Sequence, residues 1–341
     1  MKRAGKHGLD LPRPRRMTSR TVWPIAILVL GGLVLSIAAE AQQAARSYRI
    51  GFLGVDKPPT GPVSSPFRTR LADLGWTIQF EARYADGRPE RFPALAADLV
   101  RHNVDVLVTV GSHATKAAKE ATTTIPIVFI GVSSPVDAGV VASLARPGGN
   151  VTGATDQLGD LGSKLLQLIT ETIPKSSRIG ILSDPLHPSF SARARAALDQ
   201  VAQQRGVRVV RADVQRPEDL DAAFVTLSRE RVEALIVPLS PAVVRERDRI
   251  GKLDVHNRLP TITSGPGMVE AGLLMSYHPR RSEVLLQAAD QVDRILRGAK
   301  PADLPVVQPT TFELVINMRT ARALGLTLPP SLRLRADRLV E

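Results

Sequence analysis

The sequence predicts an α/β protein built from two doubly wound lobes. Short apolar runs that end in a small or polar residue alternate with amphipathic helical stretches along the chain. This alternation stops at a glycine-rich segment near the middle and then begins again. The 341 residues are enough for two domains of ordinary size.

Before the glycine-rich segment, apolar runs and helical stretches follow one another in strict alternation. The run RIGFLG at 49–54 ends in glycine, which is typical of a buried parallel strand. In PERFPALAADLVRHN, Phe92, Leu95 and Leu99 recur at helical spacing. The pattern implies a mostly parallel sheet covered on both faces, with strands at 49–54, 77–87, 104–111 and 125–132 and helices at 65–74, 89–103, 112–124 and 134–145.

The glycine-rich segment is SLARPGGNVTGATDQLG, residues 143–159. Its flanks both read as α/β units, so we interpret it as the connection between two lobes rather than as a surface loop. Gly148, Gly149 and Gly153 would allow the backbone change that a hinge requires.

The same alternation of strands and helices begins again after this connection. Helix 161–174 is followed by a strand at 178–184, and a long amphipathic helix at 189–206 ends at Gly206. Comparison with the first half indicates an internal structural duplication, with further strands at 207–214, 232–240, 260–265 and 272–278, helices at 217–231 and 242–257, and a short helix near Met268.

The N-terminus has the pattern of an export signal. Basic residues precede the apolar run VWPIAILVLGGLVLSIAA, and Ala39-Glu40-Ala41 supplies a small-x-small cleavage site before Gln42. Residues 1–41 are therefore predicted to be a signal peptide, with an uncleaved membrane anchor as the alternative and Met17 as an alternative start. A lipid anchor is excluded because the chain contains no cysteine.

Composition and motifs exclude several classes of function. Residues 1–41 hold seven Lys/Arg and two Asp/Glu, so they carry +5 of the formal +12 charge. The remaining basic residues are scattered among carboxylates without aromatic partners, which argues against nucleic-acid binding. The absence of cysteine excludes thiolate catalysis and Cys-ligated metals, and no nucleophile elbow, H-E-x-x-H or dinucleotide motif is present. We expect no enzyme activity, no cofactor and no metal.

Two doubly wound lobes form a cleft, and ligands of such folds bind outside the carboxyl ends of the strands. A hydroxyl and helix N–H groups after the third strand could hold a carboxylate, although the same hydroxyls could simply cap a helix. An aspartate at the connection or at a strand end could meet an ammonium group, and a tyrosine at a lobe crossing could stack on a ligand. The candidate ligand-binding residues are Val55, Asp56, Gly111, Ser112, His113, Thr115, Val132, Ser133, Ser134, Asp137, Asp156, Asp184, Ser240, Ser264 and Tyr277.

Several segments together resemble one family. The chain is similar to ABC-transporter substrate-binding proteins of the tryptophan/tyrosine-binding type, which have the type I periplasmic binding protein fold. The resemblance covers residues 48–341 and depends on FRTRLADLGW, ARYADGRPERFPALAADLV, PVDAGVVASLARPGGNVTG, VEAGLLMSY and ILRGAKPADLPVVQPTTFELVINMRTARALGL.

The resemblance implies how the chain is divided. It places residues 46–154 and 279–309 in lobe 1, and residues 155–278 and 310–341 in lobe 2. Three hinge strands then connect the lobes, near residues 154–156, 277–279 and 309–311. We refer to these as the first, second and third crossing segments.

The resemblance also implies a function. The expected activity is capture of a small organic ligand, an amino acid or a related carboxylate, by a monomeric periplasmic protein that delivers it to ABC permease subunits in the inner membrane. The sequence departs from the family at Tyr277-His278-Pro279-Arg280 and at Ser134, where relatives commonly carry acidic residues, so the ligand remains open. The alternatives are a periplasmic protein that reports its ligand to a signalling receptor, and an exported α/β enzyme.

Overall fold

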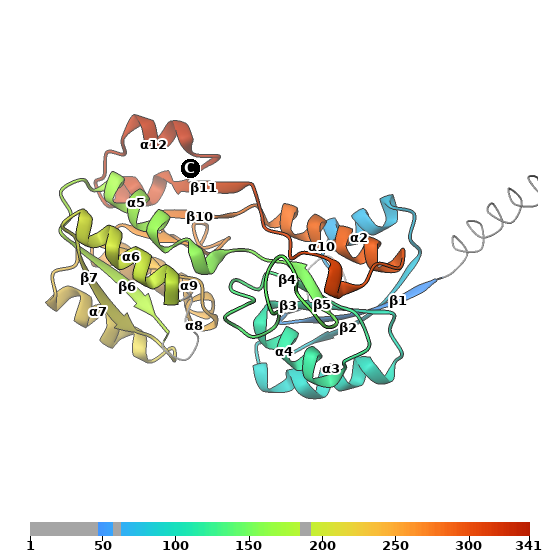
Figure 1. Ribbon diagram of the computed structural model, residues 1–341. Coiled ribbons are helices and arrows are strands. Elements are labelled where there is room, and N and C mark those ends of the chain that lie inside the picture. The colour runs from blue at the N-terminus through green and yellow to red at the C-terminus, as the bar shows by residue number, and fades with distance from the viewer. Residues whose placement is uncertain (1–46, 57–62, 185–191) are drawn as a thin grey trace, which may run out of the picture. The chain divides into compact units, whose positions relative to one another are not determined.

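The computed structural model describes residues 47–56, 63–184 and 192–341, which form two open sheets with helices on both faces (Figure 1). The predicted class, α/β with two doubly wound sheets, is confirmed. Residues 1–41, predicted to be a signal peptide, lie outside the described residues. No helix of the described ranges is long and apolar enough to cross a membrane.

The first sheet has five parallel strands in the order β2-β1-β3-β4-β5. Its interior positions are apolar on both faces, as a doubly covered parallel sheet requires. Helices α2 and α10 cover one face and α3 and α4 the other (Figure 1). The bounds are β1 (Tyr48–Gly54), α2 (Ser65–Asp73), β2 (Ile78–Tyr84), α3 (Phe92–Arg101), β3 (Val106–Val110), α4 (Gly111–Ala121), β4 (Ile127–Ile130), β5 (Val151–Ala154) and α10 (Arg281–Leu296).

Helix α10 comes from late in the sequence and packs on this first sheet. Its buried Val284, Ala288 and Val292 belong to the same apolar cluster as β1 and α2. The indole N–H of Trp76 donates to the Asp293 carboxylate at 2.7 Å, across 217 residues of sequence. The chain therefore returns to the first sheet after building most of the second.

The second sheet has seven strands in the order β12-β11-β10-β9-β8-β6-β7. The part β7-β6-β8-β9-β10 is parallel and repeats the strand order of the first sheet, which supports the predicted duplication. Strand β11 pairs with β10 in antiparallel fashion, and β12 follows it. The bounds are α5 (Gly162–Thr172), β6 (Arg178–Ser183), α6 (Ala192–Gln204), β7 (Arg208–Asp213), α7 (Asp219–Arg229), β8 (Ala234–Val237), α8 (Pro241–Arg245), α9 (Arg247–His256), β9 (Thr261–Thr263), β10 (Met275–Pro279), β11 (Phe312–Asn317), α11 (Met318–Ala323), α12 (Pro330–Arg335) and β12 (Arg338–Val340).

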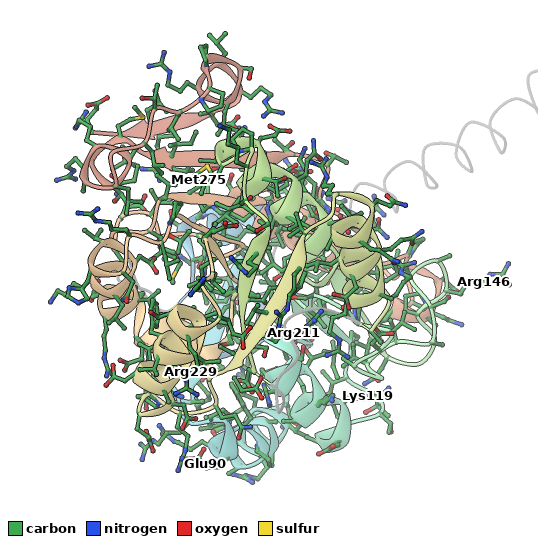
Figure 2. The ribbon with its side chains drawn as sticks, turned by 90° about the vertical axis from the view of Figure 1, so that its left-hand side faces the viewer. Glu90, Lys119, Arg146, Arg211, Arg229 and Met275 are labelled. Carbon is green, nitrogen blue, oxygen red and sulfur yellow. The ribbon has the colours of Figure 1, made fainter. Side chains whose placement is uncertain are left out.

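Both faces of the second sheet are buried against helices. One core packs α5, α6, α11 and α12 on it, and the other packs α7 and α9. Met275 of β10 is fully buried, with its sulfur 3.6 Å from the Thr172 hydroxyl. Figure 2 shows Met275 within the fold, whereas the labelled charged side chains such as Arg229 and Glu90 extend at its outside.

The structure differs from the predicted elements at three places. The helix predicted at 134–145 is a single turn, because Gly139 takes a left-handed φ of 69° and ends it. The short helix predicted near Met268 is also a turn. The glycine-rich connection contains a buried strand, β5, that completes the first sheet.

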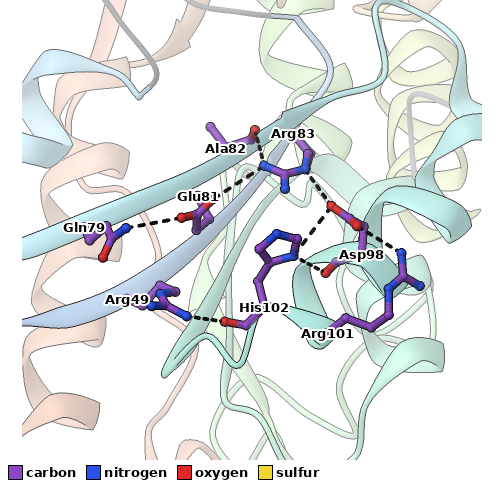
Figure 3. Close-up of polar contacts among 8 residues, drawn as sticks. All are labelled: Arg49, Gln79, Glu81, Ala82, Arg83, Asp98, Arg101 and His102. Atoms are coloured by element: carbon purple, nitrogen blue, oxygen red, sulfur yellow. Dashed lines mark hydrogen bonds and ion pairs between the residues drawn. The ribbon is translucent and has the colours of Figure 1, made fainter.

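A polar network on the surface ties β1 and β2 to α3 (Figure 3). The Asp98 carboxylate accepts from Arg83 at 2.8 Å and from Arg101 at 2.9 Å. These contacts, led by the hydrogen bond from Arg83, lower the pKa of Asp98. Arg49 adds a bond from its guanidinium to the His102 carbonyl at 2.6 Å, which holds the end of α3 against β1.

Gly153 allows β4 and β5 to pair. It lies opposite Phe129, and a Cβ at this position would be 2.3 Å from the Phe129 carbonyl oxygen and 2.6 Å from the Phe129 backbone nitrogen.

Gly153→Ala should therefore lower the free energy of unfolding by about 1–3 kcal/mol or more, as overpacking does. Denaturant titration would measure this change. Gly149→Asn is the control, because nothing lies within 4 Å and Asn tolerates its φ of 63°; equal losses in the two variants would contradict the steric explanation.

Asp254 of α9 is fully buried, and neither carboxyl oxygen has a hydrogen-bond partner of normal geometry among the described residues. Burial raises the pKa of Asp254 well above its usual value, and the Thr261 hydroxyl opposes only part of this effect. Since the folded state then binds a proton that the unfolded state releases, Asp254 lowers stability as pH rises above the ordinary carboxyl pKa.

We expect Asp254→Asn to raise the free energy of unfolding at pH 8 by about 1–3 kcal/mol, because an amide of the same shape carries no ionisation penalty and each unit of raised carboxyl pKa costs about 1.4 kcal/mol at this pH. The gain over the unchanged protein should shrink toward pH 4, where Asp254 is protonated in the folded protein and becomes protonated in the unfolded chain as well. Urea titrations across this pH range would measure the difference. A gain that does not vary with pH would show that charge burial is not its cause.

Candidate functional site

A cavity of about 240 Å³ lies at the carboxyl ends of β1, β3 and β4. It is mostly apolar, and two of its residues, Leu239 and Pro266, come from loops that follow strands β8 and β9 of the second sheet. The lining residues are Phe52, Val55, Ser64, Val110, Gly111, Ile130, Gly131, Asp156, Leu158, Leu239, Pro266, His278, Pro279, Arg281, Val284 and Leu285.

Strand order explains where the cavity lies. In a sheet of order 2-1-3-4-5, the connections diverge between the first and third strands and leave a crevice at their carboxyl ends. Val55 directly follows β1, and Val110 and Gly111 lie at the end of β3. The cavity therefore occupies the topological switch point.

Glycines at the strand ends keep this crevice open. Gly111 and Gly131 both have positive φ, 78° and 67° respectively. A Cβ on Gly131 would lie 3.2 Å from Oδ2 of Asp156, so glycine leaves room for that carboxylate.

Asp156 is held in place by the chain that follows β5. Its Oδ1 accepts from the Leu158 N–H at 3.2 Å. The preceding Thr155 donates its hydroxyl to the Val132 carbonyl at 2.7 Å and its N–H to the Val307 carbonyl at 2.9 Å. Burial raises the pKa of Asp156, and a hydrogen bond from the Ser133 side chain opposes this effect. Among the described residues no cation pairs with this carboxylate.

The second crossing segment contributes an imidazole and leads into a guanidinium. His278 is 6% exposed, and its Nδ1 lies 3.1 Å from the Pro279 carbonyl oxygen. Arg281 is the first residue of α10, and its side chain is exposed. Together with Asp156, these are the ionisable side chains among the described residues that line the cavity.

The second and third crossing segments are bonded to each other through Glu283 and Arg280. The Glu283 carboxylate accepts from the N–H and the hydroxyl of Thr310 and from the N–H of Thr311, at 2.8–2.9 Å. Burial raises the pKa of Glu283, but these hydrogen bonds outweigh it and the pKa is lowered overall. The Arg280 N–H donates to the Thr311 carbonyl at 2.9 Å.

Three of the residues proposed from the sequence line the cavity: Val55, Gly111 and Asp156. The side chain of Ser133 forms a hydrogen bond with the Asp156 carboxylate. Ser112 and His113 lie in the first turn of α4 beside the cavity. Thr115 is buried and bonds to Thr109 and to the Gly111 carbonyl, at 2.8 and 2.7 Å. Its hydroxyl stabilises the start of α4.

The other proposed residues lie outside the cavity lining. Ser264 accepts from the Leu239 N–H and Ser240 from the Val243 N–H, so both hydroxyls hold backbone turns. The Tyr277 ring stacks on Phe312 at a centroid distance of 5.5 Å. The rest are the exposed Asp56 and Asp137, the partly buried Ser134, and the buried Val132 and Asp184.

Sequence reasoning missed the apolar part of the lining. Phe52, Val110 and Ile130 belong to strands whose apolar pattern only signals burial, so nothing marks them as cavity residues. Arg281, Val284 and Leu285 lie at spacing i, i+3, i+4 on one face of α10, and only the packing of α10 on the first sheet brings them to the cavity.

A second hollow along β7 and α7 has a different character. It measures about 450 Å³, and Arg211 and Asp219 are among the residues that line it. Its charged groups already have partners: Arg211 (Figure 2) binds Asp199 at 2.6 Å, Arg216 binds Asp219 at 3.3 Å, and Asp213 accepts from the Ser183 hydroxyl. In the described ranges, no group of three or more His, Asp or Glu is placed to hold a metal ion.

Comparisons with known proteins agree with this architecture. A family model described as "ABC transporter substrate binding protein" matches residues 62–340. A tyrosine-binding protein from Clostridioides difficile (strain R20291) is 26% identical over 276 residues, which cover 80% of this chain and 79% of that protein.

Two solved structures are similar over 86% of this chain and the whole of theirs. A conserved domain protein from Vibrio cholerae O1 biovar El Tor is 26% identical, with a TM-score of 0.78. An ABC domain in complex with L-Trp from Streptococcus pneumoniae is 24% identical, with the same TM-score of 0.78, and shows likeness of fold.

Proposed function

The chain belongs to the ABC transporter substrate-binding protein family, and from that premise we propose that it captures a small organic ligand, an amino acid or a related carboxylate, for import. The observation that supports this most is the cavity at the switch point, which combines strand-end residues of the first sheet with Leu239 and Pro266 from the second. A ligand there would contact both sheets.

The size and lining of the cavity favour a small ligand. Its volume of about 240 Å³ is below the roughly 300–1,000 Å³ usual for drug-sized ligands. Apolar side chains surround a carboxylate, Asp156, that has no cationic partner among the described residues. In this proposal Asp156 binds an ammonium group, as expected for an amino acid. The tyrosine and tryptophan named for the relatives are the first ligands to test.

The proposal includes export and lobe closure. Residues 1–41 direct the chain out of the cytoplasm and are removed near Gln42, so that the mature protein acts in the periplasm and delivers its ligand to permease subunits. The three crossing segments act as the hinge. Hydrogen bonds between Thr155 and Val307 and between Gln157 and Gln308 hold the first and third segments side by side.

Asp156→Asn tests the ammonium site. Loss of a charge-assisted hydrogen bond costs about 1.5–3 kcal/mol of binding free energy. The affinity for the amino acid that raises the melting temperature of the protein most should therefore fall about 10- to 150-fold. Isothermal titration calorimetry would measure the change. Asp137→Asn is the matched control, because Asp137 is exposed and does not line the cavity. Equal affinity in the two variants would reject this role.

Closure predicts a change of size without a change of secondary structure. The mature protein would be screened with the common amino acids and small carboxylates, since a ligand that binds only the folded state raises its melting temperature. With that ligand at saturation, small-angle scattering should give a smaller radius of gyration, while helix content by circular dichroism stays constant. An unchanged radius with a verified ligand would contradict the hinge.

A further inference from the structure

Arg281 combines two features that the other arginines at the second crossing and on α10 do not share: it lines the cavity, and it has no ion-pair partner among the described residues. Its neighbour Arg280 binds the Glu313 carboxylate at 2.9 Å, and Arg297, just after the helix, binds Asp293 at 2.8 Å. Arg294 of α10 has no such partner in the described ranges, but it is exposed and does not line the cavity. Arg281 makes no hydrogen bond or ion pair with any residue of the described ranges, although it lines the cavity.

The position of Arg281 is unfavourable for a cation. It is the first residue of the 16-residue helix α10, and the positive end of a helix dipole stabilises anions and repels cations. The acidic residue of this turn, Glu283, offsets part of this effect through its charge, but its oxygens accept from Thr310 and Thr311 and form no ion pair with Arg281. A cation at this position without a charged partner is a candidate for binding an anionic group of a ligand.

The start of α10 also offers free backbone donors. The N–H groups of Arg281 and Ser282 donate to no described residue, whereas the Arg280 N–H is used by Thr311. Arg281, Val284 and Leu285 all line the cavity, so this end of the helix opens onto it. A guanidinium and helix N–H groups together match the geometry of a carboxylate.

We propose that Arg281 is the residue that selects a carboxylate ligand: its guanidinium, supported by the first N–H groups of α10, binds the carboxylate of the molecule in the cavity. This inference rests on the proposed function and deepens it. Arg281 then supplies a cation at one end of the ligand, and Asp156 supplies an anion at another. The bound carboxylate also neutralises the Arg281 guanidinium, whose positive charge is unfavourable at the N-terminus of α10.

The first arm of the test changes the ligand and leaves the protein intact. L-leucine, L-phenylalanine, L-tyrosine and L-tryptophan are each titrated against the corresponding carboxamide, which keeps the ammonium group and loses the negative charge. At least one acid should bind, and its amide should bind at least about 10-fold more weakly, as expected for the loss of a charged hydrogen-bond pair.

The second arm changes the protein. Arg281→Gln should lower the affinity for the acid at least about 10-fold and leave the affinity for the amide unchanged, and Arg281→Lys should retain part of the preference because it keeps the charge but not the planar fork. Arg294→Gln is the matched control on the same helix, since Arg294 is exposed and does not line the cavity. The ligand-free melting temperature of Arg281→Gln should stay equal or rise, because a cation leaves the helix N-terminus.

Two results overturn the proposal, and they can be told apart. If an acid binds but its amide or the Arg281→Gln variant binds equally well, the role of Arg281 is wrong while the proposed function stands. If none of the four acids or the wider set of small carboxylates binds the unchanged protein, the proposed function fails and the role of Arg281 fails with it.

Discussion

The parallel pairing of β1 with both β2 and β3 determines where the cavity lies. The helices that follow β1 and β2 pack on opposite faces of the sheet, so the two connections leave a crevice at the carboxyl end between β1 and β3. Val55 and Gly111 lie at this point, and the cavity follows from the strand order. The second sheet repeats the order around β6, and its loops supply Leu239 and Pro266.

Much of this architecture could be predicted from periodicity, because apolar runs and amphipathic helices alternate clearly. The failures have local causes. Residues 134–145 have helical composition, but Gly139 adopts a left-handed conformation that stops the first turn. Strand β5 was hidden inside the glycine-rich connection, since a four-residue strand with two small residues carries a weak β signal. Its pairing with β4 depends on Gly153, so this glycine serves close packing as well as flexibility.

The candidate site was harder to predict than the fold. Polar residues at strand ends are a sound first choice, but the chain uses several of them internally: Thr115 closes the first turn of α4, and Ser264 holds the backbone at Leu239. Tyr277 packs on Phe312 rather than on the cavity. The residues that do line it from α10 begin at Arg281, far along the sequence from Val110 at the end of β3, and no local pattern connects the two. Only the return of the chain to the first sheet brings them together.

The contacts of Glu283 limit how the proposed hinge can move. Because its carboxylate binds Thr310 and Thr311, the third crossing segment is attached to the start of α10 and must move with the first sheet. The hydrogen bond from the Arg280 N–H to the Thr311 carbonyl joins the end of the second crossing segment to the third. Beyond this point β10 and β11 pair in register from Pro279 and Phe312, as part of the second sheet. Within these two segments, the rotation of the proposed hinge would therefore be concentrated in the few bonds around Pro279 and Thr311. These bonds lie beside His278 and Arg281, so lobe movement would be coupled to the position of the charged groups in the cavity.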